Sequence, residues 1–404
     1  MRSDNMIPLL SEFLTLVSIC LSIVSCQDIH PDTELSITEI LEKHGFPAET
    51  HEVITKDGYI ITMQRIPHGK NGTGVNPKPI LMMHGLFGSA ENYVVAEMYN
   101  SSMAGYFADR GYDVWLGNAR GNIHSRRHVR LDPDKYKFWN FSYHEIAIYD
   151  VAAMVDHILK TSGKKKLYYI GHSQGGTVFY ILNSMRPEYQ KKFVQASLLA
   201  PAGLMGNYNN TLTLPLIRRR KMIEKMVNNA KIGEFPPKWF NFSQFLYGSC
   251  TETPLKYICQ GLYNTLAGGD SGEFFPHLMP HIMRFIPSVA AKQMFHFMQS
   301  IDTGCFCQWD YGKKKNQEVY GTAEPPAYDL KSIQVPIALY YGLSDTLVFP
   351  KDVEKTCSII PKCTRLYLLP NPKWTHLDFI FSVNLVKELN EPVITHMNTF
   401  KDDD

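Results

Sequence analysis

The sequence predicts an α/β fold, with a mostly parallel β-sheet, helices on both faces and an inserted, mainly helical segment. Three observations support this prediction. Apolar runs of strand type alternate with helix-compatible stretches up to residue 202 and again from residue 330. One strand–helix junction carries Gly171-His172-Ser173-Gln174-Gly175, a serine on a sharp turn between two glycines. Between residues 203 and 329 the alternation stops, and short amphipathic stretches are separated by prolines.

Length and composition are those of a folded globular protein. A chain of 404 residues can bury a large core, and 44% hydrophobic with 20% charged residues is ordinary. The formal net charge of +2 gives no reason to expect nucleic acid as a partner. His277 and His281 lie four residues apart, but Pro280 intervenes and no carboxylate lies between them, so a metal site is not expected there. We expect neither a metal nor a cofactor.

The first 26 residues differ in kind from the rest. Residues 7–24 are mostly apolar and are followed by Ser25-Cys26-Gln27, which is typical of a secretory signal peptide cleaved close to Cys26. The alternative is an uncleaved anchor, because Asp4 offsets the charge of Arg2. No later stretch approaches the ~20 apolar residues that a membrane-spanning helix needs. We therefore expect a soluble mature protein without a transmembrane segment, either secreted or lysosomal.

Cysteine usage agrees with export. Two of the eight cysteines fall in the predicted signal, which leaves six. In an oxidising compartment the close pairs are predicted disulfides, each restricting the unfolded chain by roughly 2–3 kcal/mol. Cys305 and Cys307 are too close for a relaxed ordinary bridge, so both of their redox states stay open. The close pairs are Cys250 with Cys259 and Cys357 with Cys363.

Five Asn-x-Ser/Thr sequences mark acceptors for N-glycosylation. Asn140 lies in the aromatic run Phe138-Trp139-Asn140-Phe141 and is expected to be too buried to carry a glycan. The other four are expected to lie at the surface of a glycoprotein: Asn71, Asn100, Asn209 and Asn241.

The first part of the core opens with a short helix and an antiparallel hairpin. Asp57-Gly58 is a hairpin-turn dipeptide, and the strand-like run from Tyr59 to Ile66 follows it. Buried strands and helices then alternate, which implies a mostly parallel sheet with right-handed crossovers. Gly163 is expected to end the helix before the serine turn. In chain order we expect helix 36–44, hairpin 51–66, strand 79–83, strand 112–116, helix 141–161, strand 167–170, helix 174–185 and strand 193–199.

Residues 203–329 are rich in methionine, phenylalanine and proline, which suits an inserted cap better than core strands; the alternative is simply more core. Flexible apolar side chains above an active site would suit an apolar substrate. The parallel pattern returns with strands 335–341 and 364–369 and a helical tail at 384–399. The expected division is a signal peptide at 1–26, a first core part at 27–202, a cap and lid at 203–329 and a second core part at 330–404.

Three residues that follow predicted strands can supply the groups that nucleophilic ester hydrolysis needs. A serine needs a base to remove its proton, and the base needs a third group to fix its tautomer. In the α/β-hydrolase fold the order along the chain is serine, acid, histidine. Ser173, Asp345 and His376 stand in that order, each after a predicted strand. Asp378 is the rival acid, but it lies two residues beyond His376 and is better placed to cap the following helix.

Two backbone amides are candidates for an oxyanion hole. Gly85, after the strand at 79–83, lets the main chain pass close to a substrate carbonyl, and Leu86 would present its amide there. The amide of Gln174 is the natural second donor, and one such donor is typically worth about 3–4 kcal/mol in the transition state. The polar loop at 117–122 could be a turn held by Asn and Arg hydrogen bonds or could contact substrate; both interpretations stay open.

Beyond the triad, the chain resembles the acid lipases of the gastric and lysosomal type over residues 44–394. The resemblance implies Ser173 as nucleophile, Asp345 as acid, His376 as base and the amides of Leu86 and Gln174 as oxyanion donors. It also implies a cap disulfide, which matches Cys250 with Cys259. The shared motifs are Gly45-Phe46-Pro47, Val53 to Tyr59, Arg65-Ile66-Pro67, His84-Gly85-Leu86, Gly111 to Asn118, Gly171 to Gly175, Trp309-Asp310-Tyr311-Gly312 and His376-Leu377-Asp378-Phe379.

Such enzymes hydrolyse triacylglycerols or sterol esters, often at acidic pH, beneath a cap and lid. This chain departs from the family pattern at Ala119, commonly serine, at Tyr93, often tryptophan, and in the Cys305-Phe306-Cys307 pair. The resemblance therefore implies a serine lipase acting on neutral lipids at a lipid–water interface through an acyl-enzyme. Two alternatives are an esterase or acyltransferase for smaller esters and a non-catalytic lipid-binding protein on a hydrolase scaffold.

Overall fold

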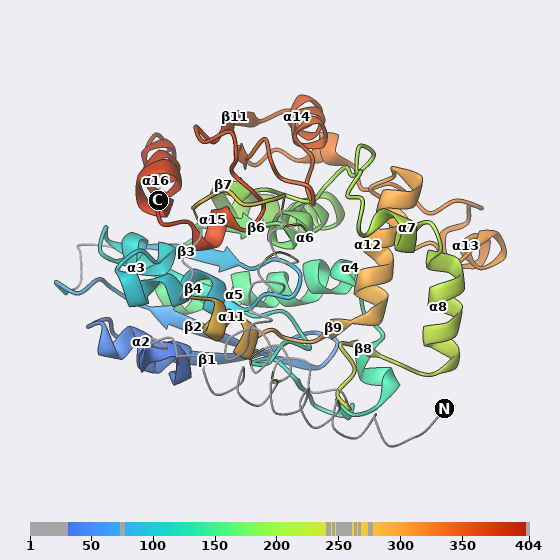
Figure 1. Cartoon of the computed structure of the whole chain (residues 1–404), viewed down its shortest axis with the longest axis horizontal. Coiled ribbons are helices and arrows are strands. Elements are labelled where there is room, and N and C mark those ends of the chain that lie inside the picture. The colour runs from blue at the N-terminus through green and yellow to red at the C-terminus, as the bar shows by residue number, and fades with distance from the viewer. Residues whose placement is uncertain are drawn as a thin grey trace, which may run out of the picture.

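A computed structural model describes residues 31–72, 77–239 and 278–400, together with residues 244, 247, 261, 265 and 268–273 (Figure 1). Its centre is a nine-stranded sheet in the order β1-β2-β4-β3-β6-β7-β10-β11, with β5 beside β2. Along this order, β4, β3, β6, β7, β10 and β11 pair in parallel with one another. Strand β2 pairs antiparallel with β1, β4 and β5. The strands are β1 (Glu49–Ile54), β2 (Tyr59–Ile66), β3 (Lys78–Met83), β4 (Tyr112–Gly117), β5 (Arg127–His128), β6 (Leu167–His172), β7 (Phe193–Leu199), β10 (Ile337–Tyr341) and β11 (Cys363–Leu368).

Helices cover both faces of the sheet, so the fold class predicted from the sequence is confirmed (Figure 1). Alternate residues of one strand enter different cores, since Leu81 and Met83 pack on one face and Ile80 and Met82 on the other. Helices α5 and α6 lie over the first core, and α3 and α16 over the second. The core helices are α2 (Ile37–Lys43), α3 (Met103–Ala108), α4 (Tyr143–Glu145), α5 (Ala152–Ser162), α6 (Gln174–Met185), α14 (Pro350–Ile359), α15 (Asp378–Phe381) and α16 (Glu391–Met397).

The predicted hairpin, strands and helices of the core occur close to the expected positions. Ser36 caps α2 through a reciprocal bond with Glu39, and Gly163 ends α5 with a left-handed φ of 70°. The helix expected at 141–161 is different in detail, because α4 passes into a π-helical turn at Ile146–Val151 before α5 begins. The tail likewise starts with a π-helical turn at Val386–Asn390. A π-turn inserts one extra residue, which re-aims the side chains around it.

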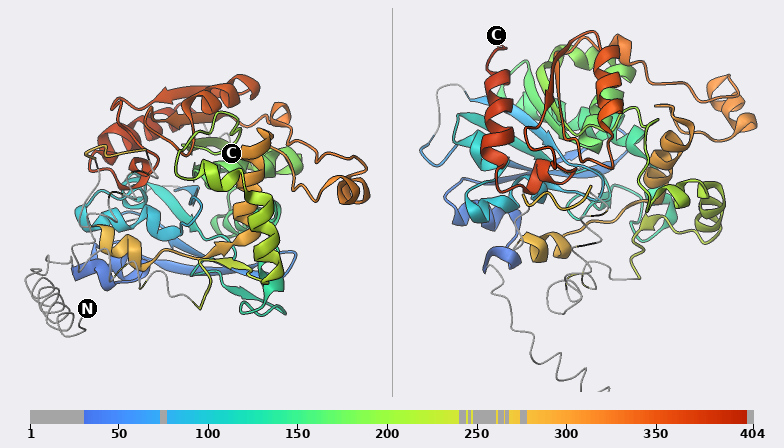
Figure 2. Two further views of the ribbon diagram at one scale, coloured as in Figure 1. Left: turned by 45° about the vertical axis from the view of Figure 1, so that its right-hand side comes forward. Right: turned by 45° about the horizontal axis from the view of Figure 1, so that its top comes forward.

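The segment between β7 and β10 contributes no strand to the main sheet within its described residues. It forms α7 (Leu214–Ile217), α8 (Arg220–Asn229), α11 (Met279–Arg284), α12 (Ala291–Thr303) and α13 (Lys313–Tyr320), with a small antiparallel pair, β8 (Glu234–Phe235) and β9 (Val289–Ala290). Helices α8 and α12 lie side by side at one end of the molecule, and α13 projects from it (Figures 1 and 2). The cap boundaries at 203 and 329 stay a prediction.

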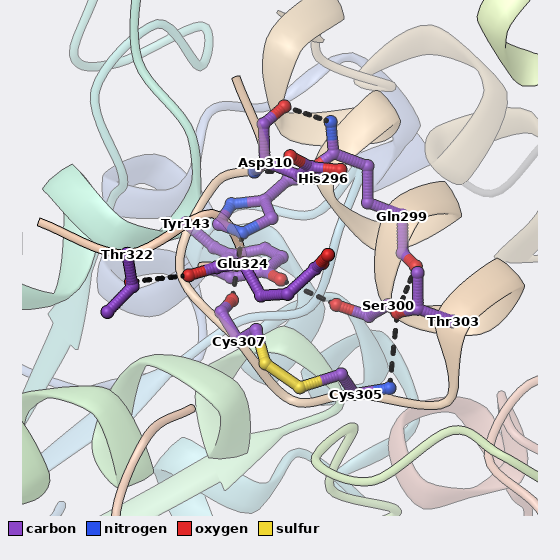
Figure 3. The surroundings of a disulfide bond; sticks show 10 residues. All are labelled: Tyr143, His296, Gln299, Ser300, Thr303, Cys305, Cys307, Asp310, Thr322 and Glu324. Carbon is purple, nitrogen blue, oxygen red and sulfur yellow. Dashed lines mark hydrogen bonds between the residues drawn. A yellow bond between two sulfur atoms is a disulfide. The ribbon is translucent and has the colours of Figure 1, made fainter. Parts of the chain in front are cut away.

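Two disulfides lie in the described part of the chain. Cys357 and Cys363 join α14 to β11, which confirms that predicted pair. Cys305 and Cys307, whose state was open, are also bonded, after the end of α12 (Figure 3). The predicted signal peptide at 1–26, His277 and the pair Cys250 and Cys259 lie outside the described residues. Among the described helices, none has the length and apolar character to cross a membrane.

The predicted burial of Asn140 is wrong. Its neighbours Phe138, Trp139 and Phe141 are buried, but Asn140 ends a 3-10 turn and is exposed. The acceptors at Asn71, Asn100 and Asn209 are exposed as well, and Asn241 lies outside the described residues. Occupation of these sites stays a prediction.

Gly175→Ala is expected to destabilise the core. A Cβ at this position would overlap the carbonyl oxygen of Met83, at the end of β3. Overpacking of this kind typically costs about 1–3 kcal/mol, measured as the free energy of unfolding in urea. Gly206→Ala is the matched control, because the nearest atom to its new Cβ would be 3.8 Å away. Equal losses in the two variants would contradict the tight contact between α6 and β3.

Candidate active site

Ser173 lies on the turn between β6 and α6 in a strained backbone conformation. Its φ is 54° and its ψ is −113°, a region that L-residues rarely adopt. The amide of Ser173 donates to the carbonyl of Leu199 over 2.9 Å, and its own carbonyl accepts from the amide of Gly176 over 2.9 Å. A Cβ at residue 171 would lie 2.6 Å from the carbonyl carbon of Gly175. Since a Cβ at residue 175 would overlap Met83, the serine turn requires glycine on both sides.

Asp345 and His376 form a buried pair after β10 and β11. His376 Nδ1 lies 2.7 Å from Asp345 Oδ2, and the two side chains are about equally enclosed. The other carboxylate oxygen of Asp345 accepts from the amides of Leu347 and Val348, each over 2.8 Å. The carboxylate is thus fixed by three bonds, and it fixes the tautomer of His376 with the proton on Nδ1. The Nε2 atom of His376 is left to act as a base.

Two contacts bring the serine turn and the histidine loop together. The Nε2 atom of His172 donates to the carbonyl oxygen of His376 over 3.0 Å, and the two imidazole rings lie 4.8 Å apart. A Cβ at Gly85 would lie 3.1 Å from Ser173 Cβ, so the loop after β3 passes directly beside the serine. Within the described residues no hydrogen bond joins Ser173 Oγ to His376. This bond is often long until substrate binds.

Asp378 does not cap the following helix, so that part of the prediction is wrong. It is the first residue of α15, and its Oδ2 atom accepts from the amide of Thr375 over 2.6 Å and from the Thr375 hydroxyl over 2.7 Å. Its Oδ1 atom accepts from Ser271 over 2.9 Å. Asp378 therefore holds the turn that carries His376, and burial raises the pKa of its carboxyl.

The two predicted oxyanion donors belong to segments that meet at Ser173. Leu86 follows Gly85 in the loop after β3, and Gln174 is the first residue of α6. Within the described residues, the backbone N–H groups of Leu86 and Gln174 donate no hydrogen bond to a backbone carbonyl of the turns and loops. The helix N-terminus adds its partial positive charge at this point. The arrangement can hold a developing negative charge next to Ser173.

His84 positions the loop that carries Leu86, a role that the sequence did not reveal. Its Nδ1 atom donates to the carbonyl oxygen of Gly85 over 2.7 Å, and its Nε2 atom accepts from the amide of Ala119 over 3.1 Å. Both bonds require a neutral ring, and burial lowers the pKa of His84 to about 4. Because its partner Ala119 lies 35 positions along the chain, no local pattern could have identified this contact.

The loop at 117–122 is held by Asn and Arg hydrogen bonds, as the first of the two interpretations of the sequence expects. The side chain of Asn118 accepts from the amide of Ala90 and donates to the carbonyl of Thr62. Arg120 is buried, and its guanidinium and amide bind the carboxylate of Asp150 over 2.6–3.0 Å. The guanidinium also binds Asp57 in the hairpin turn. The loop is anchored to protein atoms on every side.

Charge balance explains this anchor. Burial raises the pKa of Asp150 to about 6, and the positive charge of Arg120 opposes that rise. Burial alone would lower the pKa of Arg120, but the carboxylate of Asp150 reverses the effect and raises it. Three donors from one arginine favour the charged carboxylate, so we assign an ion pair. Asp150 lies in the π-helical turn, which aims its side chain at Arg120.

The side chain of Gln174 links the serine turn to the insertion. Its Oε1 atom accepts from Nε2 of Gln293, on α12, over 2.6 Å. The residue is buried, and within the described residues its Nε2 atom has no hydrogen-bond partner. No group of three potential metal ligands occurs among the described residues.

His84→Gln is expected to flatten the pH dependence of stability. The pKa of folded His84, about 4, lies below the unfolded value of about 6.5. Its contribution to stability is therefore complete above pH 6.5 and is lost as the pH falls toward 4. Between these values the free energy of unfolding should fall by up to about 1.4 kcal/mol less per pH unit in the variant than in the native protein. Urea unfolding at several pH values measures this, and identical slopes would contradict it.

Two family models match the chain. One describes a partial α/β-hydrolase lipase region and matches residues 37–97, and the other describes the α/β-hydrolase fold and matches residues 78–204. Among solved structures, a putative lipase from Sulfolobus solfataricus superposes with a TM-score of 0.58 at 16% identity, over 88% of this chain and 95% of that one. At this low identity the likeness shows the fold alone.

Curated relatives are much more similar in sequence. Lipase 1 of Drosophila melanogaster is 40% identical over 365 residues, which cover 90% of this chain and 80% of that protein. Gastric triacylglycerol lipase of Homo sapiens is 34% identical over 377 residues, which cover 92% of this chain and 93% of the human enzyme. The match extends through the core strands and the insertion alike. The chain therefore belongs to the acid lipase family of the α/β-hydrolase fold, and it is a hydrolase of carboxylic esters.

Proposed function

We propose that Ser173, His376 and Asp345 form the catalytic triad of this lipase. His376 Nε2 takes the proton of the serine hydroxyl as Ser173 Oγ attacks the ester carbonyl carbon, and Asp345 stabilises the imidazolium that forms. The carbonyl oxygen becomes an oxyanion between the amides of Leu86 and Gln174. The alcohol then leaves with the proton from His376, and an acyl-enzyme remains.

Hydrolysis of the acyl-enzyme uses the same groups. His376 removes a proton from water, the hydroxide attacks the acyl carbon, and the returning proton restores Ser173 as the fatty acid leaves. The observation that carries this proposal is the buried bond of 2.7 Å between His376 Nδ1 and Asp345 Oδ2 next to a strained serine turn. A carboxylate that holds an imidazole beside a serine is the arrangement that activates a serine nucleophile, which favours a catalytic role.

For the substrate we propose a neutral lipid ester, a triacylglycerol or a sterol ester, taken from a lipid–water interface. A relative with 34% identity is named gastric triacylglycerol lipase. The insertion exposes large apolar side chains, and Trp239 is 82% exposed. Exposed apolar side chains favour contact with lipid. Within residues 203–239 they are Leu212, Leu216, Met222, Met226, Phe235 and Trp239. We further propose that the enzyme is secreted or lysosomal.

Ser173→Ala is expected to abolish ester cleavage and leave the fold intact. Loss of a serine nucleophile typically lowers kcat by roughly 10⁶-fold. Cleavage of a chromogenic ester and covalent labelling by a fluorophosphonate probe measure the loss, and circular dichroism confirms the fold. Labelling of the variant at the native rate would show that another residue is the nucleophile.

Asp345→Asn and Asp378→Asn separate the two candidate acids. We expect Asp345→Asn to lower kcat by about 10⁴-fold, because the tautomer of His376 is no longer fixed. Asp378→Asn should reduce stability with a far smaller effect on kcat, since Asp378 binds Thr375 and Ser271. Steady-state kinetics on a soluble ester decide between them. The reverse order of effects would make Asp378 the catalytic acid.

Activity as a function of substrate concentration tests the lipid assignment. A lipase is expected to become much more active once a short-chain triacylglycerol exceeds its solubility limit, because the exposed apolar side chains of the insertion bind the droplets. Saturation below that limit would identify an esterase for soluble substrates. Rates on an emulsified triacylglycerol and on a cholesteryl ester between pH 4 and pH 8 then define the preferred alcohol.

A further inference from the structure

A cavity lies where the insertion meets the core. It has a volume of about 290 Å³ and is bounded by α8, by α12, by the 3-10 turn Tyr136–Trp139 and by residues 309–311. None of the candidate catalytic residues contributes to it. Five of the residues that line it are aromatic, and amide and carboxylate groups lie among them. The residues that matter here are Tyr136, Trp139, Trp309, Tyr311, Asn228 and Glu224.

This combination suits a sugar ring. Small-molecule cavities usually join apolar walls to a few polar groups that fix orientation, and they start at roughly 300 Å³. Aromatic faces pack against the C–H face of a sugar, and the side chains of Glu224 and Asn228 offer oxygen acceptors to its N–H and O–H groups. Burial raises the pKa of Glu224, as expected for a carboxyl in a partly enclosed site.

Asn140 lines the same cavity and is an acceptor for N-glycosylation. It opens the sequence Asn140-Phe141-Ser142, and it is exposed although its neighbours are buried. Its Oδ1 atom accepts from Lys292 Nζ over 3.4 Å. Within the described residues no hydrogen bond is donated by its Nδ2 atom, the atom that a glycan would occupy. Lys292 therefore orients the amide without blocking the atom to be modified.

We propose that Asn140 carries an N-linked glycan whose first N-acetylglucosamine lies in this cavity. Transfer forms a bond between Asn140 Nδ2 and the anomeric carbon of the sugar. It breaks the bond from that carbon to the diphosphate of a lipid-linked oligosaccharide, which leaves as a diphosphate with the amide proton. The sugar then fills the space between the 3-10 turn and the insertion, and so joins the two parts of the molecule.

Transfer must precede folding of this segment. Ser142, the third residue of the acceptor sequence, is fully buried, and its hydroxyl is bound by Glu145 and His296. Figure 3 shows His296 against Tyr143 in this packed region, where the rings lie 3.9 Å apart. A glycosyltransferase cannot reach Ser142 in the folded protein. It can do so in the emerging chain, and the sugar is then enclosed as the insertion docks.

The test uses the full chain produced in a eukaryotic secretory host. Glycopeptide mass spectrometry is expected to find a glycan at Asn140, and Asn140→Gln should lose one glycan mass. In the native protein, peptide N-glycosidase should release the Asn140 glycan about tenfold more slowly than after denaturation, a difference that corresponds to about 1.4 kcal/mol of protection. Glycans at the exposed positions Asn71, Asn100 or Asn209 are the matched control and should be released readily from the native protein.

Tyr136→Ala opens the exposed wall of the cavity and should bring native release at Asn140 close to the denatured rate. Asn140→Gln should also lower the melting temperature more than Asn209→Gln does. An unmodified Asn140 overturns the proposal, whether or not other sites carry glycans. If Asn140 is modified but its glycan is released equally fast from native and denatured protein, the first sugar does not lie in the cavity.

Discussion

Helix α6 can pack against strand β3 only because residue 175 has no side chain, and the rest of the site depends on this contact. The overlap that a Cβ would create with the carbonyl of Met83 leaves no room for adjustment in the backbone. With α6 this close, the chain must turn within one residue after β6. Ser173 takes up that turn with a positive φ, at the carboxyl end of β6. A steric constraint in the core thus fixes the position of the proposed nucleophile.

The other proposed catalytic groups lie at the same end of the sheet because the strands before them pair in parallel. Strands β3, β6, β10 and β11 all run in one direction, so the loops that follow them share an edge. His84 then locks the first of these loops to the loop after β4, and Arg120 fixes that loop to the hairpin and to the π-helical turn. The edge is therefore a rigid frame of neutral and ionic hydrogen bonds around a single reactive turn.

The sequence predicted the elements whose cause lies in consecutive residues. It did not reveal the contacts between residues that are far apart in the chain. The strand, serine turn and helix at 167–185 were predictable because their cause is local. The contact from His84 to Ala119 and the π-turn that aims Asp150 at Arg120 depend on long-range packing. The burial of Asn140 was predicted wrongly from its aromatic neighbours, because the 3-10 turn directs them inward and leaves the asparagine outside.

Strands β7 and β10 are hydrogen-bonded neighbours, although more than a hundred positions separate them in the sequence. The chain thus leaves the sheet after β7 and returns to it at the neighbouring strand, so that the sheet pairs as if a loop connected the two strands. Loop closure costs little more as such a loop lengthens. Evolution can therefore exchange or remodel this segment without disturbing the pairing of the sheet, and new substrates become accessible to an unchanged reaction centre.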